Sequence, residues 1–480
     1  MKKLYHRGSL LAGVMLVLGV SANAQITFMK SYGGTDYEWG QSVLQTADSG
    51  YVIVGATRSF GAGKYDVYLI RTDAFGNTLW TRTYGDTLEQ GGVDVLQTGD
   101  RGFVIVANTQ TLTRNNDIWL IRTTASGDTL WTRSIGTAAR DVGYSLVEAY
   151  DGGYVIVGQT GEGSGALAYM VKVTAAGQTV WSRQFSAGTH NCANQVRRAT
   201  DSGYVAVGVT YDPGYPYYSN VYLFKTDTAG NQVWSKTYGE RWNYESGWGL
   251  DATENGGYVL VGSAERLGGG GYTPYLIKIT AGGDTVWTRC PISALGAGYS
   301  VCAARDGGYV LTGNVGGGNA TDIWLHKVGP NGENVWSRSW PGGGEDNGRW
   351  IVRTNDGGYA VTGFSNSTSQ FYDIFLLKTR ADGTIGIEEP KARPGSANRL
   401  SLSRVTTTGM NISYRVSEPC QVILRLYDRA GNQVSELVNS RREPGSYSVP
   451  LSTASLPAGN YFCRLQVGGA AETAKLTVIR

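Results

Sequence analysis

The stretch Asp151-Gly152-Gly153-Tyr154-Val155-Ile156-Val157 decides the fold, because its pattern of a tight turn, an aromatic residue and an apolar run recurs along the chain. The pattern has seven copies, whose aromatic residues lie 50 to 54 residues apart. The turns and their aromatic residues are Asp48-Ser49-Gly50-Tyr51, Asp100-Arg101-Gly102-Phe103, Asp151-Gly152-Gly153-Tyr154, Asp201-Ser202-Gly203-Tyr204, Asn255-Gly256-Gly257-Tyr258, Asp306-Gly307-Gly308-Tyr309 and Asp356-Gly357-Gly358-Tyr359. A fixed period of this length indicates a tandem repeat of one supersecondary unit.

Each unit contains four predicted strands. In the first unit we expect them over residues 40–46, 51–56, 66–72 and 78–84, separated by turns rich in Asp, Asn and Gly. The second strand is apolar nearly throughout, as in a sheet that is covered on both faces. A tryptophan recurs in the fourth strand, and we interpret it as a packing residue between neighbouring units: Trp80, Trp131, Trp181, Trp234, Trp287 and Trp336.

The seventh unit lacks this tryptophan, because after the predicted strand 373–379 the chain reaches Gly383-Thr384-Ile385-Gly386. Residues 26–34 match residues 79–85, with Phe28 at the tryptophan position. We therefore expect the N-terminal segment to supply the missing strand and to close a seven-bladed β-propeller over residues 25–386. An open solenoid is the alternative, and it would require distinct capping repeats.

The repeat resembles that of the bacterial seven-bladed β-propeller family (SBBP repeat) over residues 26–386. The matching segments of the first unit are Gly40-Gln41-Ser42-Val43, Tyr51-Val52-Ile53-Val54-Gly55, Asp66-Val67-Tyr68-Leu69-Ile70 and Trp80-Thr81-Arg82-Thr83-Tyr84-Gly85. The resemblance implies the fold and leaves the chemistry open, because propellers carry many functions.

Residues 1–24 have the features of a secretory signal peptide. Lys2, Lys3 and Arg7 precede an apolar stretch, and Ala22-Asn23-Ala24 is a small-residue cleavage site. A membrane anchor is the alternative, although the apolar stretch is short for spanning a bilayer. We expect the mature chain to begin at Gln25 and to lack a transmembrane segment. The formal net charge of +3 over 480 residues gives no indication of nucleic-acid binding.

The period stops after Gly386, and residues 387–396 are a predicted linker containing Pro390 and Pro394. Residues 397–480 alternate in the manner of a small Ig-like β-sandwich. Cys420 and Cys463 share the parity of apolar core positions in it, so a disulfide between them is one possibility.

Three segments of this C-terminal module resemble the type A sorting domain of the type IX secretion system. They are Tyr427-Asp428-x-x-Gly431, the segment from Leu456-Pro457-Ala458-Gly459 to Leu465, and the terminal Lys475-Leu476-x-Val478-Ile479-Arg480. The resemblance implies export through the periplasm and outer membrane, with the secretion machinery as partner and the cell surface or the medium as destination. A sandwich without a sorting role is the alternative.

Residues suited to catalysis are few. In the mature chain only His190 and His326 remain, and we interpret His326 as a packed strand residue. Asp66, Asp117, Asp322 and Asp373 recur at the start of the third strand, which favours a structural role. No zinc, EF-hand or phosphate-binding motif is present, so we predict no metal, no cofactor and no catalytic residue. A hydrolase that uses two carboxylates at the propeller mouth is the alternative, acting on polysaccharide or peptide.

The connections between second and third strands, and between units, vary in length and composition. Both sets emerge on one face of a propeller, here called the variable face, and loops on a rigid scaffold carry function. We expect aromatic residues there to form a shallow site for a glycan or a peptide: Tyr211, Tyr215, Tyr217, Tyr218, Trp242 and Tyr244. The sequence thus predicts an exported binding or adhesion module.

Overall fold

The computed structural model divides the chain into two compact units, Met1–Ile387 and Glu388–Arg480. It describes residues 26–110, 116–239, 244–265, 270–292, 295–317, 320–367 and 370–385 of the first unit. In the second unit it describes residues 400–402, 410–416, 418–428, 433–452, 456–457, 459–467 and 470–478. The predicted signal peptide and the predicted linker lie outside the described residues.

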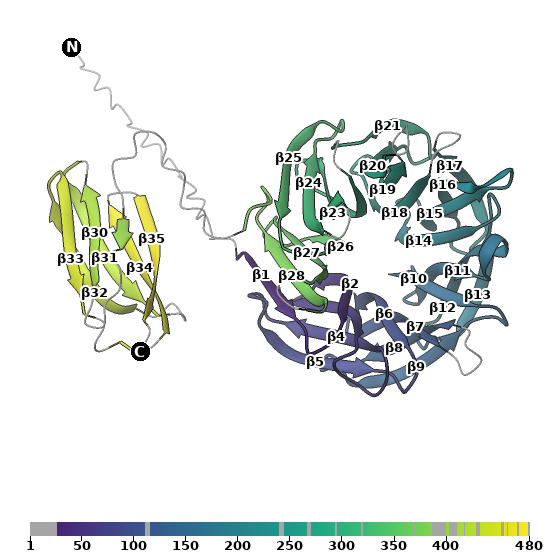
Figure 1. The fold of residues 1–480 in the computed structure, drawn as a ribbon, viewed down its shortest axis with the longest axis horizontal. Coiled ribbons are helices and arrows are strands. Elements are labelled where there is room, and N and C mark those ends of the chain that lie inside the picture. The colour runs from purple at the N-terminus through teal and green to yellow at the C-terminus, as the bar shows by residue number, and fades with distance from the viewer. Residues whose placement is uncertain are drawn as a thin grey trace, which may run out of the picture. The chain divides into compact units, whose positions relative to one another are not determined.

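Seven antiparallel sheets of four strands surround a central axis as the blades of a β-propeller (Figure 1). Blade 1 contains β2 (Glu38–Gln45), β3 (Tyr51–Thr57), β4 (Asp66–Thr72) and β5 (Thr78–Tyr84), and blade 2 contains β6 (Gln90–Gln97), β7 (Phe103–Gln110), β8 (Asn116–Thr123) and β9 (Thr129–Ile135). Blade 3 contains β10 (Asp141–Glu148), β11 (Tyr154–Thr160), β12 (Leu167–Val173) and β13 (Thr179–Phe185). The 3₁₀ turn η1 (Gly163–Gly165) lies between β11 and β12.

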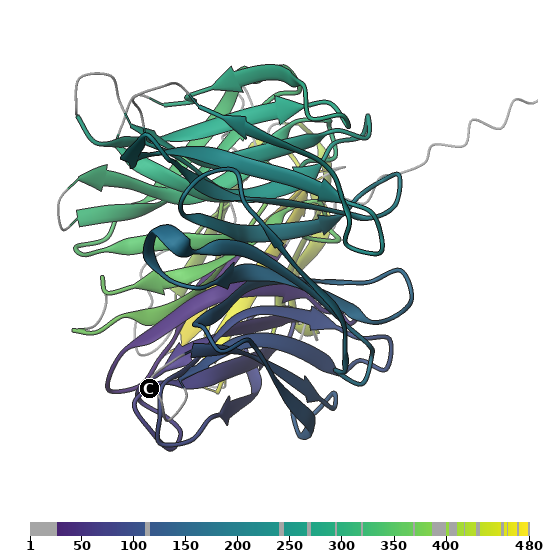
Figure 2. The ribbon, with the colours of Figure 1, turned by 90° about the vertical axis from the view of Figure 1, so that its right-hand side faces the viewer.

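Blades 4 to 6 repeat this order. Blade 4 contains β14 (Asn191–Arg198), β15 (Tyr204–Asp212), β16 (Tyr215–Thr226) and β17 (Gln232–Tyr238). Blade 5 contains β18 (Glu245–Ala252), β19 (Tyr258–Glu265), β20 (Tyr272–Ile279) and β21 (Thr285–Arg289). Blade 6 contains β22 (Gly296–Ala303), β23 (Tyr309–Gly317), β24 (Ala320–Val328) and β25 (Asn334–Trp340). The first strand of each blade is innermost and contacts the first strands of its neighbours. Seen from the side, the strands run between two opposite faces, where the loops gather (Figure 2).

Blade 7 is completed by the N-terminal strand, as the sequence predicts. It contains β26 (Asp346–Arg353), β27 (Tyr359–Ser365) and β28 (Asp373–Thr379), and β1 (Phe28–Tyr32) is its outermost strand. β1 pairs antiparallel with β28 in the register Phe28↔Lys378 to Tyr32↔Ile374. The ring is therefore closed, and the alternative of an open solenoid is wrong.

The recurring tryptophan packs against the next blade. A Cβ atom placed on Gly127, in the outer turn of blade 2, would lie 2.9 Å from the Trp80 ring, so only glycine fits there. Gly127 also has a φ of 82°, which favours glycine independently. The same joint links the other blades, with Trp131 on Gly177, Trp181 on Gly230, Trp234 on Gly283, Trp287 on Gly332 and Trp336 on Gly383.

Phe28 makes the seventh joint. Its ring would lie 2.5 Å from a Cβ atom on Gly76 of blade 1. The Tyr32 hydroxyl donates to the Gly76 carbonyl at 2.8 Å, as the Tyr84 hydroxyl donates to Gly127 at 2.6 Å between blades 1 and 2. The closing joint thus uses the contacts of the internal joints.

The aspartate of the repeated turn pairs with a basic residue of the third strand in the same blade. Asp48 binds Arg71 at 2.5 Å, Asp100 binds Arg122 at 2.6 Å, and Asp151 binds Lys172 at 2.6 Å. Further pairs are Asp201–Lys225, Asp306–Lys327 and Asp356–Lys378. Each basic side chain is almost buried, and the turn carboxylate neutralises its charge.

The second unit is a β-sandwich, consistent with the expected module. One sheet contains β29 (Leu400–Leu402), β30 (Met410–Val416) and β33 (Gly445–Leu451); the other contains β32 (Gln433–Arg442), β31 (Cys420–Tyr427), β34 (Gly459–Val467) and β35 (Ala470–Val478). Both sheets contribute to one core, which includes Ile412, Leu424 and Leu465.

The cysteines of this sandwich are free thiols. Cys463 pairs with Leu426, six positions beyond Cys420 on β31. Six residues of a strand span about 20 Å, far more than a disulfide can bridge. The shared parity is present, since Cys463 belongs to the core cluster and the partly buried Cys420 packs against it, but the strand register separates them.

The closing joint predicts the effect of losing β1. Deleting residues 25–34 should lower the melting temperature strongly, because β28 would become an unpaired edge. Phe28→Ala should cost about 1–3 kcal/mol, less than the loss of a fully buried ring. Thermal melts test both variants, with Met29→Ala as a control because Met29 is exposed. An unchanged melting temperature for the deletion would contradict closure by β1.

The turn aspartates predict acid destabilisation. A hydrogen bond from the Thr98 hydroxyl, with a second from Arg122, lowers the pKa of Asp100 to about 2. Side-chain hydrogen bonds also lower the pKa of Asp48, Asp151, Asp201 and Asp306. A pKa lower in the folded than in the unfolded state gives stability that is present above about pH 4 and is lost as the pH falls toward the folded pKa.

We expect the melting temperature to fall progressively between about pH 5 and pH 2, by a small amount for each blade because these carboxylates are more than half exposed. Asp100→Asn should lower stability at pH 7 and make no difference at the acid end. Melting curves over this range, with and without the substitution, measure the effect; a wild-type curve that rises toward pH 2 would refute it.

Candidate functional site

The innermost strand of every blade carries a β-bulge at its fourth residue. A bulged residue is left out of the strand pairing and its side chain is re-aimed. Because these strands surround the axis, the bulged residues form a ring there, here called the axial ring. Its members are Gln41, Val93, Tyr144, Asn194, Trp248, Tyr299 and Arg349, each at least partly exposed.

Two residues before each bulge, the innermost strand pairs with the second strand of the blade. In blade 5 both members of this pair are serines, Ser246 and Ser263. The pairs of the other blades, in chain order, are Trp39–Ala56, Gly91–Asn108, Val142–Gln159, Cys192–Val209, Ala297–Asn314 and Asn347–Phe364. The short serine side chains leave space over blade 5.

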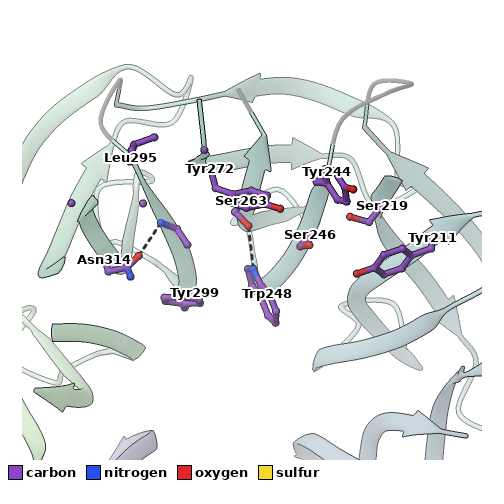
Figure 3. A pocket seen from close by; sticks show the side chains of 14 residues that line it. Tyr211, Ser219, Tyr244, Ser246, Trp248, Ser263, Tyr272, Leu295, Tyr299 and Asn314 are labelled. Atoms are coloured by element: carbon purple, nitrogen blue, oxygen red, sulfur yellow. Dashed lines mark hydrogen bonds between the residues drawn. The ribbon is translucent and has the colours of Figure 1, made fainter. Parts of the chain in front are cut away.

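A pocket of about 440 Å³ fills this space and extends toward blades 4 and 6 (Figure 3). Its floor comes from Ser246 on β18, Ser263 on β19 and Tyr272 on β20, which follow one another from the axis outward. The remaining lining residues are Tyr211, Ser219, Tyr244, Trp248, Gly271, Leu295, Gly296, Ala297, Tyr299, Asn314 and Gly316. The pocket is therefore a radial groove on the variable face, here called the blade-5 pocket.

Aromatic rings lie at both ends of the blade-5 pocket. Trp248 is 37% exposed and Tyr272 is 47% exposed. The Trp248 indole nitrogen donates to the Ser263 hydroxyl at 3.4 Å, and its ring meets Tyr299 edge-on, with centroids 6.1 Å apart. These two contacts fix the indole plane while leaving part of its surface accessible.

The polar groups of the lining are neutral. Asn314 accepts from the Ala297 amide at 3.0 Å and donates to Asn347 at 2.7 Å, so its amide orientation is fixed. Burial raises the pKa of Tyr272 above its ordinary value, so its hydroxyl, like that of any tyrosine, is neutral at neutral pH. Among the described lining residues there is no carboxylate, histidine, cysteine, lysine or arginine.

Arg197 crosses the axis beyond the axial ring. It extends from β14 in blade 4, three residues after Asn194, and its guanidinium carbon lies 5.9 Å from the Trp350 ring centroid in blade 7. Its Nε atom lies 3.7 Å from a carboxylate oxygen of Asp251 in blade 5. Arg197 thus links blades 4, 5 and 7 across the axis.

At the junction of blades 7 and 1, large aromatic residues fill the positions that correspond to Ser246 and Ser263 in blade 5. Trp39 stacks on Tyr65 with ring centroids 5.1 Å apart, and Phe364 meets Tyr372 edge-on at 5.0 Å. Tyr37 contacts both Trp39 and Tyr372. These rings use one another as packing partners, whereas Trp248 retains a free surface.

The structure brings together some of the residues predicted from the sequence. Tyr211 and Tyr244 line the blade-5 pocket, and the Tyr218 ring lies 5.5 Å from the Tyr244 ring. Tyr215 and Tyr217 belong to β16, but the structure does not describe their side chains. Trp242 lies outside the described residues.

Sequence reasoning missed Trp248, Tyr272 and Tyr299. Trp248 and Tyr299 lie inside strands, whereas the aromatic residues expected from the sequence were those of loops. Aligning the repeats would have found Trp248 and Tyr299, because each follows a glycine of the innermost strand at a position that carries six different residue types in the seven blades. A position that varies in this way marks a side chain that the blade does not need for packing.

The recurring acids and the histidines have structural contacts. Asp66 accepts from the amides of Ala62 and Gly63 at 2.9 and 3.2 Å and so braces its loop. His326 is buried, stacks on Trp324 and lies 3.1 Å from the Asn334 amide oxygen, as its packing role predicts. His190 is bonded to the Gly163 carbonyl at 2.8 Å.

The described residues contain no group of three or more His, Cys, Asp and Glu side chains that could hold a metal ion. No helix among them is long and apolar enough to cross a membrane.

No family model matches the sequence, and no curated protein matches it. Similar solved structures include a protein of unknown function from Bacteroides caccae, with 11% identity, a TM-score of 0.38, and coverage of 64% of this chain and 94% of that one. The β-propeller domain of the Trilobed protease from Pyrococcus furiosus has 11% identity, a TM-score of 0.41, and coverage of 76% and 100%. A puromycin hydrolase mutant has 13% identity, a TM-score of 0.46, and coverage of 78% and 58%. These similarities say nothing about a ligand.

Proposed function

We propose that this protein is an exported binding module whose propeller holds a carbohydrate in the blade-5 pocket. The observation that carries the proposal is the exposed Trp248 ring, fixed by Ser263 and Tyr299 at the axial end of a neutral groove. Large exposed aromatic surfaces that do not serve packing mark interaction sites.

The composition of the pocket favours a carbohydrate over a peptide. A pyranose ring presents C–H groups on its faces, which pack on an aromatic ring, and hydroxyl groups around its edge. The pocket offers matching groups: aromatic rings at both ends and the hydroxyls of Ser246 and Ser263 between them. Each hydroxyl can donate and accept, as a sugar hydroxyl requires of its partner.

The pocket chemistry favours binding over hydrolysis. Glycoside hydrolysis requires two carboxylates on either side of the scissile bond, and the described lining residues provide none. Asp251, an axial carboxylate three residues after Trp248, is paired with Arg197 and accepts from the Ala303 amide.

Export is the second part of the proposal. It rests on the signal-like residues 1–24 and on the resemblance of residues 397–480 to type A sorting domains of the type IX secretion system. The sandwich is a compact unit of its own, which is compatible with a sorting domain that is removed after export. The proposed destination is the cell surface or the medium. The repeat of the propeller resembles that of the SBBP family.

Ligand binding is tested with a glycan array on the full chain, followed by titration of the best binder. Trp248→Ala should cost about 2 kcal/mol of binding free energy, roughly thirtyfold in affinity, if this ring is the central contact. Ser246→Trp should abolish binding by filling the groove, and should fold because blade 1 carries Trp39 at the same position.

Tyr65→Ala is the matched control, because it removes an aromatic ring of the same face at the filled junction of blades 7 and 1. It should bind as the wild type does. If Trp248→Ala and Ser246→Trp also retain full affinity, the blade-5 pocket is not the site.

Export is tested by mass spectrometry of surface and medium fractions. The exported protein should lack residues 1–24 and 397–480, and removing residues 397–480 from the gene should leave the propeller in the periplasm. A truncated propeller that still reaches the surface would contradict the sorting role.

A further inference from the structure

Arg349 belongs to the axial ring and lies next to the blade-5 pocket. Its guanidinium carbon lies 4.4 Å from the centroid of Tyr299, a lining residue of that pocket, and 5.4 Å from the centroid of Phe364. Trp248, Tyr299 and Arg349 are the bulged residues of blades 5, 6 and 7, and each contacts the next. They form a continuous row around the axis.

The Arg349 side chain has no acidic partner among the described residues. Of its polar atoms, Nε is shielded from solvent and makes no hydrogen bond. Arg197, the other axial arginine described above, is paired with Asp251. The axial ring contains no acidic residue, so the charge of Arg349 is not compensated within it.

This arrangement prepares an anion site. The Arg349 guanidinium lies against two aromatic rings, and its planar fork of N–H donors matches the two oxygens of a carboxylate. The two Nη atoms, unlike Nε, are open to solvent and make no hydrogen bond among the described residues, so a carboxylate can accept from both of them.

We propose that the ligand is an acidic glycan, whose carboxylate binds Arg349 while a neighbouring sugar ring lies against Trp248. The inference rests on the proposed carbohydrate binding and specifies the class of sugar, namely a uronic-acid polymer. The carboxylate is the group that distinguishes it from a neutral glycan, and Arg349 is the residue that reads it.

Calorimetric titration of the full chain tests this with tetramers of galacturonate, mannuronate and guluronate, each compared with its methyl ester. Esterification removes the charge and retains the sugar ring. At least one acid tetramer should bind the wild type about tenfold or more tightly than its ester, because hydrogen bonds to charged groups are the strong ones. The difference should shrink at high salt.

Arg349→Gln should abolish the preference for the acid while leaving the affinity for the ester unchanged, and Arg349→Lys should retain part of it. Arg338→Gln is the matched control, because Arg338 also lies over an aromatic ring, that of Trp336, but on an outer strand. It should retain the full preference. Should Arg349→Gln fail to fold, the wild-type comparison of acid and ester still decides.

Equal affinity for acid and ester in the wild type would overturn this inference alone. Equal weakening of both by Arg349→Gln would likewise overturn it. Absence of binding by every tetramer, acid and ester, would contradict the inference, and the glycan array then decides separately whether the proposed function fails too. A tetraglutamate peptide that binds more tightly than the sugars would replace the acidic glycan by an acidic protein partner.

Discussion

The contact between an outer-strand aromatic ring and the turn glycine of the next blade determines the architecture. It occurs seven times, with six tryptophans and Phe28, and each glycine both adopts a positive φ and leaves room for the ring. Because the same contact joins every neighbouring pair of blades, the blades share one orientation. The first and last blades therefore meet through the same kind of contact as the others. Because these repeated joints hold the blades together, the residues of an individual blade can vary at positions that the packing between blades does not require.

The candidate site is such a variation. The bulged residues of the innermost strands are exposed at the axis, and the pairs beside them differ in size from blade to blade. Large rings fill these positions at the junction of blades 7 and 1, while two serines leave a groove in blade 5. One scaffold thus produces a filled region and an open pocket on the same face. The chemistry of the pocket follows from the few residues that the joints do not constrain.

The sequence predicted the fold in detail, because the period, the turns and the tryptophans are local and repeated. The third and fourth strands of blade 1 coincide with their predicted bounds, and Phe28 could be recognised by its alignment with the tryptophans. The site was predicted only in part. Tyr211 and Tyr244 were found as loop aromatics, but Trp248 and Tyr299 are exposed by bulges, which depend on strand register. Arg349 could not be singled out, because its contacts and its lack of an acidic partner depend on how blades 6 and 7 meet. The parity of Cys420 and Cys463 was right, but only the register shows their separation.

The central claim is that the blade-5 pocket is the ligand site. A crystal structure of the protein grown with an acidic sugar tetramer tests this claim most directly. The account predicts density for a sugar ring against Trp248, over Ser246 and Ser263, with a carboxylate on the guanidinium of Arg349. Density at the aromatic cluster of blades 7 and 1, with an empty blade-5 pocket, would contradict it.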